Sequence, residues 1–155
     1  MKRHRIYKDL ILAGLVVFIL AGLPLGIWAY NQELWQSRIS AGAKVFSFTA
    51  HNELGWLPGR VKGYDVVSLD DNQPVYKPIL VVNQGDTVVL KLTSADVIHG
   101  LSIKDFGIFI EDGIRPGKVK LVKFKADKAG VFTFSCNIIC GSHHKNMQGT
   151  LIVRA

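Results

Sequence analysis

The sequence predicts an all-β domain, a sandwich or barrel, that is preceded by a single membrane-spanning helix. From Lys44 onward, short runs rich in Val, Ile, Phe and Thr are interrupted by Gly, Pro, Asn and Asp, as is typical of strands joined by turns. Residues 10–29 carry no charged side chain, and no useful helical periodicity occurs outside them. These two patterns divide the chain into an anchor and a folded domain.

The uncharged segment 10–29 is long enough for an uncleaved anchor, because a helix rising about 1.5 Å per residue crosses a hydrocarbon core of about 30 Å in twenty residues. A secretory signal peptide is the alternative. Its apolar region is shorter, about 7–15 residues, and ends at small residues, whereas Trp28 and Tyr30 stand at the end of this one. We therefore assign residues 9–30 to a transmembrane helix, with Pro24 as a candidate kink.

Basic residues set the expected orientation of this helix. Lys and Arg dominate the tail of residues 1–8, so the positive-inside rule keeps the N-terminus in the cytoplasm. Residues 31–43 are then a polar stalk, and residues 44–155 form a periplasmic or otherwise extracytoplasmic domain. The chain is thus expected to be a single-pass protein of the plasma membrane.

The formal net charge of +7 is unevenly distributed. Residues 1–40 carry five Lys and Arg against two Asp and Glu, and residues 41–155 carry fourteen against ten. The exported domain is therefore only mildly basic. Export argues against a nucleic-acid partner, and the charge instead suits a docking protein or the headgroups of membrane lipid.

The expected strands of the domain span 44–50, 78–82, 87–93, 99–103, 107–111, 118–125, 131–135 and 147–154. In the segment 118–125, lysines alternate with apolar residues, and the alternation slips at Leu121–Val122, which predicts a β-bulge. Residues 51–77 are the least regular part, and we expect them to form a long excursion that includes a hairpin.

The segment from Cys136 to Met147 carries the chemistry. Soft or borderline metal ligands follow Cys136 at +4, +8 and +11, namely Cys140, His144 and Met147. Thiolate, imidazole and thioether together select copper over Mg, Ca or Mn. A strand ending just before Cys136 would present the loop on a rigid scaffold, and His99, at the start of another strand, is the best candidate for a donor from elsewhere.

Simpler interpretations of these residues compete with copper. A disulfide between Cys136 and Cys140 is common in exported proteins, but it leaves the spacing of His and Met unexplained. A zinc site of two Cys and two His needs no Met, and a single-copper blue site leaves one cysteine surplus. His143 is either a surface residue or a supporting group, while His4 and His51 fit no pattern.

The pattern Cys-x3-Cys-Gly-x2-His-x2-Met resembles the CuA centre in subunit II of haem-copper cytochrome c oxidases. The segment ADVIHGLSI, residues 95–103, resembles the one that carries the first histidine ligand of that family, and residues 113–136 resemble the stretch between the two ligand regions. The resemblance covers about residues 78–155. It implies a cupredoxin-like Greek-key β-sandwich or barrel that holds a binuclear copper centre.

The resemblance also implies a role for each ligand. The expected metal ligands are the bridging thiolates of Cys136 and Cys140, the imidazoles of His99 and His144, the weakly bound thioether of Met147 and the backbone carbonyl of Ile138. Most family members have a glutamate at position 138 that also helps bind magnesium at a subunit interface, a role that Ile138 cannot fill. With one expected helix, the chain most resembles the single-helix subunit II of B-type oxidases.

By this resemblance, the chain relays electrons from a cytochrome c, or from a small copper protein, to haem in a membrane-embedded catalytic subunit that reduces oxygen. No oxygen-reducing centre is expected in the chain itself, so oxidase activity would belong to the complex. Trp56, Phe46 and Phe48 are candidates for an electron-accepting surface, although core packing suits the phenylalanines better. The alternatives are the CuA subunit of a membrane nitric oxide reductase and a copper-binding chaperone module.

Overall fold

A computed structural model describes residues 2–37, 39, 41–60 and 74–155 of the chain. The chain divides into two compact units, Met1–Ala41 and Gly42–Ala155. Part of the expected excursion, residues 61–73, lies outside the described residues.

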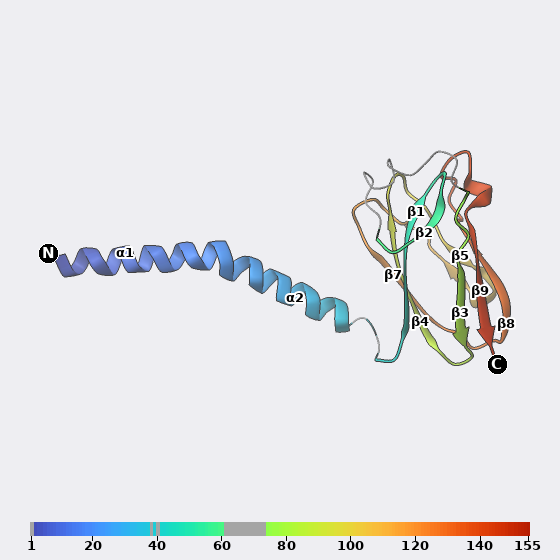
Figure 1. Ribbon diagram of the computed structural model, residues 1–155, viewed down its shortest axis with the longest axis horizontal. Helices are drawn as coiled ribbons and strands as arrows, with labels where there is room; N and C mark the ends of the chain where they lie inside the picture. Colours follow the sequence, from blue (N-terminus) through green and yellow to red (C-terminus); the bar gives the residue numbers. More distant parts are fainter. Residues whose placement is uncertain (1, 38, 40, 61–73) are drawn as a thin grey trace. The chain divides into compact units, whose positions relative to one another are not determined.

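The first unit is helical (Figure 1). It consists of α1 (Lys2–Val17), the π-helical turn η1 (Phe18–Gly22) and α2 (Leu23–Ser37). The N–H of Leu23 donates to the carbonyl of Phe18, five residues earlier. Pro24 follows at once; because proline cannot donate a backbone hydrogen bond and crowds the preceding turn, a local widening of the helix there is physically expected. Among the described residues, the helical stretch Ile6–Asn31 is long and apolar enough to cross a membrane.

The second unit is a sandwich of two sheets, which confirms the all-β prediction. One sheet has the order β2-β1-β4-β7 and the other the order β3-β9-β8-β5-β6, and Figure 1 shows the two layers face to face. The strands of the first sheet are β1 (Lys44–His51), β2 (Gly55–Pro58), β4 (Thr87–Ser94) and β7 (Lys120–Lys125). The strands of the second are β3 (Ile79–Asn83), β5 (Ser102–Ile103), β6 (Ile108–Phe109), β8 (Gly130–Ser135) and β9 (Gln148–Arg154).

Both sheets mix parallel and antiparallel pairs. β1 runs parallel to β4, and β3 runs parallel to β9, while β1–β2, β4–β7 and β8–β9 are antiparallel. Among the described strands, the chain passes from one sheet to the other five times, between β2 and β3, β3 and β4, β4 and β5, β6 and β7, and β7 and β8. Such crossings, in place of simple hairpins, are the connections of a Greek-key sandwich.

The core lies between the sheets and is built from one face of each strand. In β9 the residues alternate between buried and less buried, with Leu151 and Val153 inside. The central strand β4 is buried along most of its length. Trp56 and Phe134 are fully buried and meet edge to face, with ring centroids 6.0 Å apart. Trp56 is therefore a core residue, and the idea that it forms an electron-accepting surface is wrong.

Two expected strands are shorter in the structure. Of the expected strand 99–103 only β5, Ser102–Ile103, pairs as a strand, and of 107–111 only β6, Ile108–Phe109. The N–H of Gly100 donates to the sulfur of Cys136 in place of a neighbouring strand. The strand 99–103 is therefore shortened because the backbone of Gly100 binds the Cys136 sulfur.

The predicted β-bulge in residues 118–125 is wrong. β7 pairs with β4 in unbroken register from Lys120 opposite Leu92 to Lys125 opposite Thr87. The slip in the sequence pattern has another cause. Lys120 shares the inward register of Val122 and Phe124 but lies at the end of the strand. There it forms an ion pair with Asp112. A charged residue can occupy the inward register there because the core no longer covers it.

The substitution Phe134→Ala tests this core. Phe134 contacts both Phe48 and Trp56 and is 0% exposed. Its removal should lower the free energy of unfolding of the domain by about 3–5 kcal/mol, because a large cavity remains. Urea unfolding of the full chain in detergent, followed by tryptophan fluorescence, measures this. Phe109→Ala, at a side chain that is 53% exposed, is the control and should cost less than half as much.

Candidate metal centre

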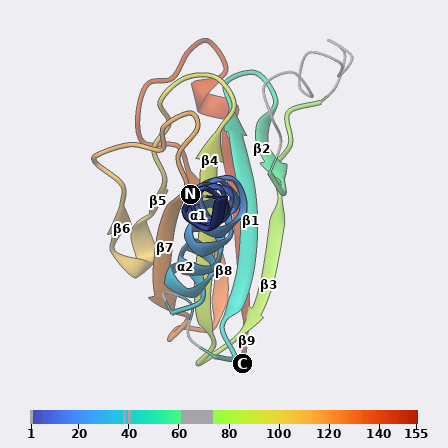
Figure 2. The ribbon, with the colours of Figure 1, turned by 90° about the vertical axis from the view of Figure 1, so that its left-hand side faces the viewer.

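Three connections meet at one end of the sandwich, as Figure 2 shows. They are the β1–β2 turn, the loop that leads from β4 to β5, and the loop between β8 and β9 with its short 3-10 turn η3 (His144–Asn146). The loop before β5 supplies His99, and the β8–β9 loop supplies the two cysteines, His144 and Met147. Residues that are far apart in the sequence therefore come together because the strands that carry them end at the same edge.

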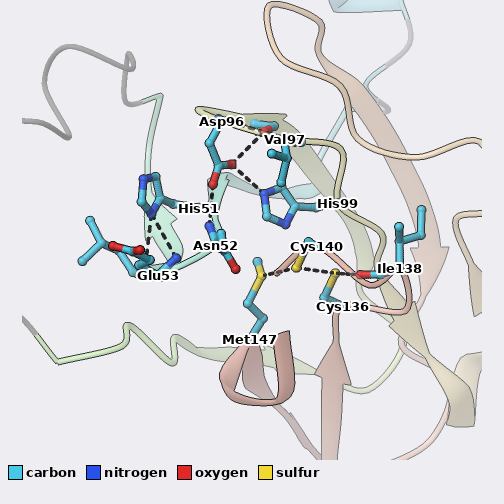
Figure 3. Close-up of polar contacts among 12 residues, drawn as sticks. His51, Asn52, Glu53, Asp96, Val97, His99, Cys136, Ile138, Cys140 and Met147 are labelled. Atoms are coloured by element: carbon cyan, nitrogen blue, oxygen red, sulfur yellow. Dashed lines mark hydrogen bonds and ion pairs between the residues drawn. The ribbon is translucent and has the colours of Figure 1, made fainter. Parts of the chain in front are cut away.

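The two cysteine sulfurs lie at the centre of this end (Figure 3). Cys136 Sγ and Cys140 Sγ are 3.8 Å apart, and both thiols are free. The thioether sulfur of Met147, which is fully buried, lies 3.3 Å from Cys140 Sγ. On the other side, the carbonyl oxygen of Ile138 lies 3.2 Å from Cys136 Sγ. Two thiols, a thioether and a carbonyl thus form one buried cluster.

His99 completes the cluster from a different segment, the loop before β5. It is 0% exposed, and one ring nitrogen lies with the two cysteine sulfurs in a group whose ligand atoms are all within 4.8 Å of one another. Its Nε2 is 2.7 Å from Asp96 Oδ1, whereas its buried Nδ1 has no hydrogen-bond partner. A buried nitrogen without a partner is costly, and a metal ion bound beside the thiols would satisfy it.

The two histidines of the loop differ in position. His144 is half-buried, and its Nδ1 lies 3.6 Å from Cys140 Sγ. His143 is exposed, and its Nδ1 lies 3.2 Å from the hydroxyl of Ser142. The structure therefore brings His144 to the cluster and leaves His143 at the surface. His51 lies apart, where its Nδ1 accepts the N–H groups of Glu53 and Leu54.

The thiols have very different affinities for protons. Burial alone would raise the pKa of Cys136, but His99, the N–H of Gly100 and the backbone of Ile138 stabilise the thiolate and lower the pKa to about 6. Burial raises the pKa of Cys140, and the neighbouring Cys136 thiolate raises it further, to about 12. Without metal, the thiolate of Cys136 therefore forms readily, whereas that of Cys140 is disfavoured. A metal ion must displace the proton of Cys140 in order to bind it.

His99 and Asp96 form the ionic partner of that thiolate. Burial alone would lower the pKa of His99, but Asp96 and Cys136 raise it to about 9. Burial alone would raise the pKa of Asp96, but hydrogen bonds from His99 and from the backbone of Asn52 and Val97 lower it to about 2. Sequence reasoning missed Asp96, although a carboxylate three residues before a candidate ligand is a signal that could have found it.

The close approach of the two ligand segments depends on Gly100. Its N–H donates to Cys136 Sγ at 3.3 Å. A Cβ at this position would lie 2.9 Å from Cγ1 of Ile138 and even closer to the side chain of Asn137. A residue without a side chain therefore lets the cysteine loop pack directly on the backbone next to His99.

The donor set fits copper. Thiolate and thioether sulfurs select soft metal ions, and imidazole suits copper as well. The cluster is buried on a β-scaffold, as a site that must keep its geometry requires. The fold and the donors together define a cupredoxin-like domain with a sulfur-rich candidate metal site.

Known proteins narrow this class to one family. The chain belongs to the cytochrome c oxidase subunit II family, since the family model of that subunit's periplasmic domain matches residues 64–154. Cytochrome c oxidase subunit 2 of Thermus thermophilus is 40% identical over 73 residues, which are 47% of this chain and 53% of that protein. The subunit 2 of Cereibacter sphaeroides is 36% identical over 74 residues, 48% of this chain and 24% of the relative.

Other relatives and structures extend the likeness. The nitrous-oxide reductase of Stutzerimonas stutzeri is 33% identical over 76 residues, 46% of this chain and 12% of that enzyme. A chain in the cryo-EM structure of a heme-copper terminal oxidase dimer has the same fold, with a TM-score of 0.52 and 20% identity, over 96% of this chain and 99% of that one. The chain spans about half the length of the two Thermus relatives, 53% and 42%.

The unequal thiols give a pH dependence that can be measured without metal. Because the pKa of Cys136 is lowered to about 6 and that of Cys140 is raised to about 12, one thiolate should form between about pH 5 and pH 8. Ultraviolet thiolate absorbance of the reduced, metal-free protein should rise by one equivalent in this range. Cys136→Ser should abolish the rise, and a wild type whose absorbance stays flat until pH 8 would contradict the assignment.

Proposed function

We propose that this chain is the electron-transfer subunit of a terminal cytochrome c oxidase and holds a binuclear CuA centre. One observation carries the proposal: in a member of the subunit II family, two free thiols 3.8 Å apart share a buried cluster with an unpartnered imidazole nitrogen and a thioether. The second thiol favours two coppers over one, because a single-copper blue site uses only one cysteine.

In the proposed centre, Cys136, Cys140, His99 and His144 would hold the two copper ions. Met147 and the carbonyl of Ile138 are weak outer ligands. The copper pair, when bound, would accept and release one electron while its bonds change little. The ring nitrogens support this assignment. Nδ1 of His144 lies 3.6 Å from Cys140 Sγ, and Nδ1 of His99 is buried without a hydrogen-bond partner while Asp96 occupies its Nε2.

The residues around the site keep it rigid and dry. Cys136, Cys140 and Met147 are buried, and the N–H of Gly100 contacts the Cys136 sulfur directly. The backbone of Cys136 is bound to that of Met147, which closes the loop at its base. Ligands that are held this way move little when the charge of the site changes, so electron transfer meets a low reorganisation barrier.

The proposed setting is the plasma membrane. Residues 9–30 anchor the chain in lipid, residues 1–8 lie in the cytoplasm, residues 31–43 form the stalk and residues 44–155 are the periplasmic CuA domain. The length and apolar character of Ile6–Asn31 support the anchor, and the basic tail supports its orientation. Electrons pass from cytochrome c, or a cupredoxin donor, to haem in the catalytic subunit, where oxygen is reduced.

The copper spectrum of the full chain tests the site. Loaded with copper in detergent, it should bind two coppers and give an electron paramagnetic spectrum of one unpaired electron shared by both. Cys140→Ser should lose the shared signal, because only one bridging thiolate remains, and Lys145→Ser, in the same loop, is the control that should retain it. A wild-type spectrum from a single copper would refute the binuclear proposal.

The partner subunit tests the complex. Affinity purification of the tagged chain from its native membranes should retrieve a larger haem-containing subunit, and the preparation should consume oxygen with reduced cytochrome c. Consumption of nitric oxide without oxygen reduction would instead identify the nitric oxide reductase alternative. Transfer of copper to an acceptor protein, with no haem partner retrieved, would favour the chaperone alternative. A tagged membrane protein with an unrelated domain is the control.

A further inference from the structure

Asp96 holds two segments of the candidate site at once. Its Oδ1 lies 2.7 Å from Nε2 of His99, and its Oδ2 accepts the N–H of Asn52 at 2.7 Å. Figure 3 shows the carboxylate between the imidazole and the β1–β2 turn. The N–H of Asp96 in turn donates to the hydroxyl of Ser94 at 3.2 Å, which fixes the base of the side chain. Each carboxylate oxygen therefore has its own partner.

The first of these contacts determines which ring nitrogen of His99 is left for the sulfur cluster. The backbone of His99 is fixed by two hydrogen bonds with Ile114, but these leave the ring free to turn. Among the described residues, Asp96 is the hydrogen-bond partner of the ring, at Nε2, and Nδ1 is buried without one. Since Asp96 occupies Nε2, Nδ1 is the nitrogen that remains for the cluster.

The second contact ties the β1–β2 turn to the same carboxylate. The side chain of Asn52 lies so close to Gly141, the neighbour of Cys140, that a Cβ at position 141 would collide with it. Asn52 thus covers the cysteine loop while its backbone N–H is held by Asp96. Through these contacts one carboxylate connects the turn, His99 and the cysteine loop at Gly141.

We propose that Asp96 is a positioning residue that fixes the His99 ring with Nδ1 toward the thiols and locks the β1–β2 turn over the site. The role toward copper rests on the proposed function. A carboxylate suits both tasks because both of its oxygens only accept hydrogen bonds. An asparagine would present one NH2 group, which cannot accept from the imidazole or from Asn52, so Asp96→Asn must lose one of the two contacts.

Proton exchange in the copper-free full chain tests the positioning role by itself. With histidine labelled by 15N, the Nε2 proton of His99 should exchange with water at least tenfold faster in Asp96→Ser, whose side chain is too short to reach the ring, than in wild type. Asp112→Asn removes a carboxylate of a surface ion pair and should leave the rate unchanged. Asp96→Ala gives the same readout if Asp96→Ser does not fold. Equal exchange in wild type and the folded variant would overturn the proposal.

The copper-loaded full chain supplies the second readout. Loss of a negative charge beside His99 should shift the reduction potential to more positive values and change the copper hyperfine pattern. Asp96→Glu keeps a carboxylate and should recover part of both effects. An unchanged potential and spectrum in Asp96→Asn would refute the role toward copper. A single-copper spectrum in the wild type would refute the proposed function instead, and the exchange result would still decide the positioning role.

Discussion

The contact between the Gly100 N–H and the Cys136 sulfur joins the two halves of the candidate site. One half is the loop between β8 and β9, and the other is the segment just before β5. The shortened β5, the close packing of Ile138 on Gly100 and the burial of His99 beside the thiols all accompany this contact. A backbone donor is well suited to this place, because it adds a hydrogen bond to sulfur without adding a side chain.

The charge state of the two thiols depends on burial, which disfavours both thiolates, and on the neighbouring groups that stabilise one of them. A single thiolate at Cys136 is stabilised by His99, which Asp96 supports in turn. Burial disfavours a second thiolate at Cys140, and the first thiolate opposes it further. Two buried negative charges so close together need added positive charge. The protein thus holds a half-ionised site that a pair of metal cations would complete, and binding them would release protons.

The helical unit shows a smaller local adjustment of its backbone. Pro24 cannot donate a backbone hydrogen bond, and the helix widens by one residue just before it. Figure 1 shows that the helix bends in this region. A long apolar helix with such a turn keeps most of its backbone bonded internally, which the interior of a membrane demands.

The sequence by itself determined the all-β class and the apolar helix, and it marked Cys136, Cys140, His144 and Met147 as a candidate ligand loop. These features are local: strand patterns, helix length and ligand spacing are set by neighbours along the chain. His99 was also found in this way, because it stands at the start of a recognisable segment.

Only the tertiary structure decided which residues pack in the core and which groups support the candidate ligands. Trp56 proved to be core, the slip in residues 118–125 proved to be a strand end, and Asp96 proved to hold His99. Each of these depends on residues distant in sequence: Phe134 packs on Trp56, Asp112 pairs with Lys120, and Asn52 binds Asp96. A spacing rule cannot reveal such contacts, because they form only when separate segments of the chain pack together.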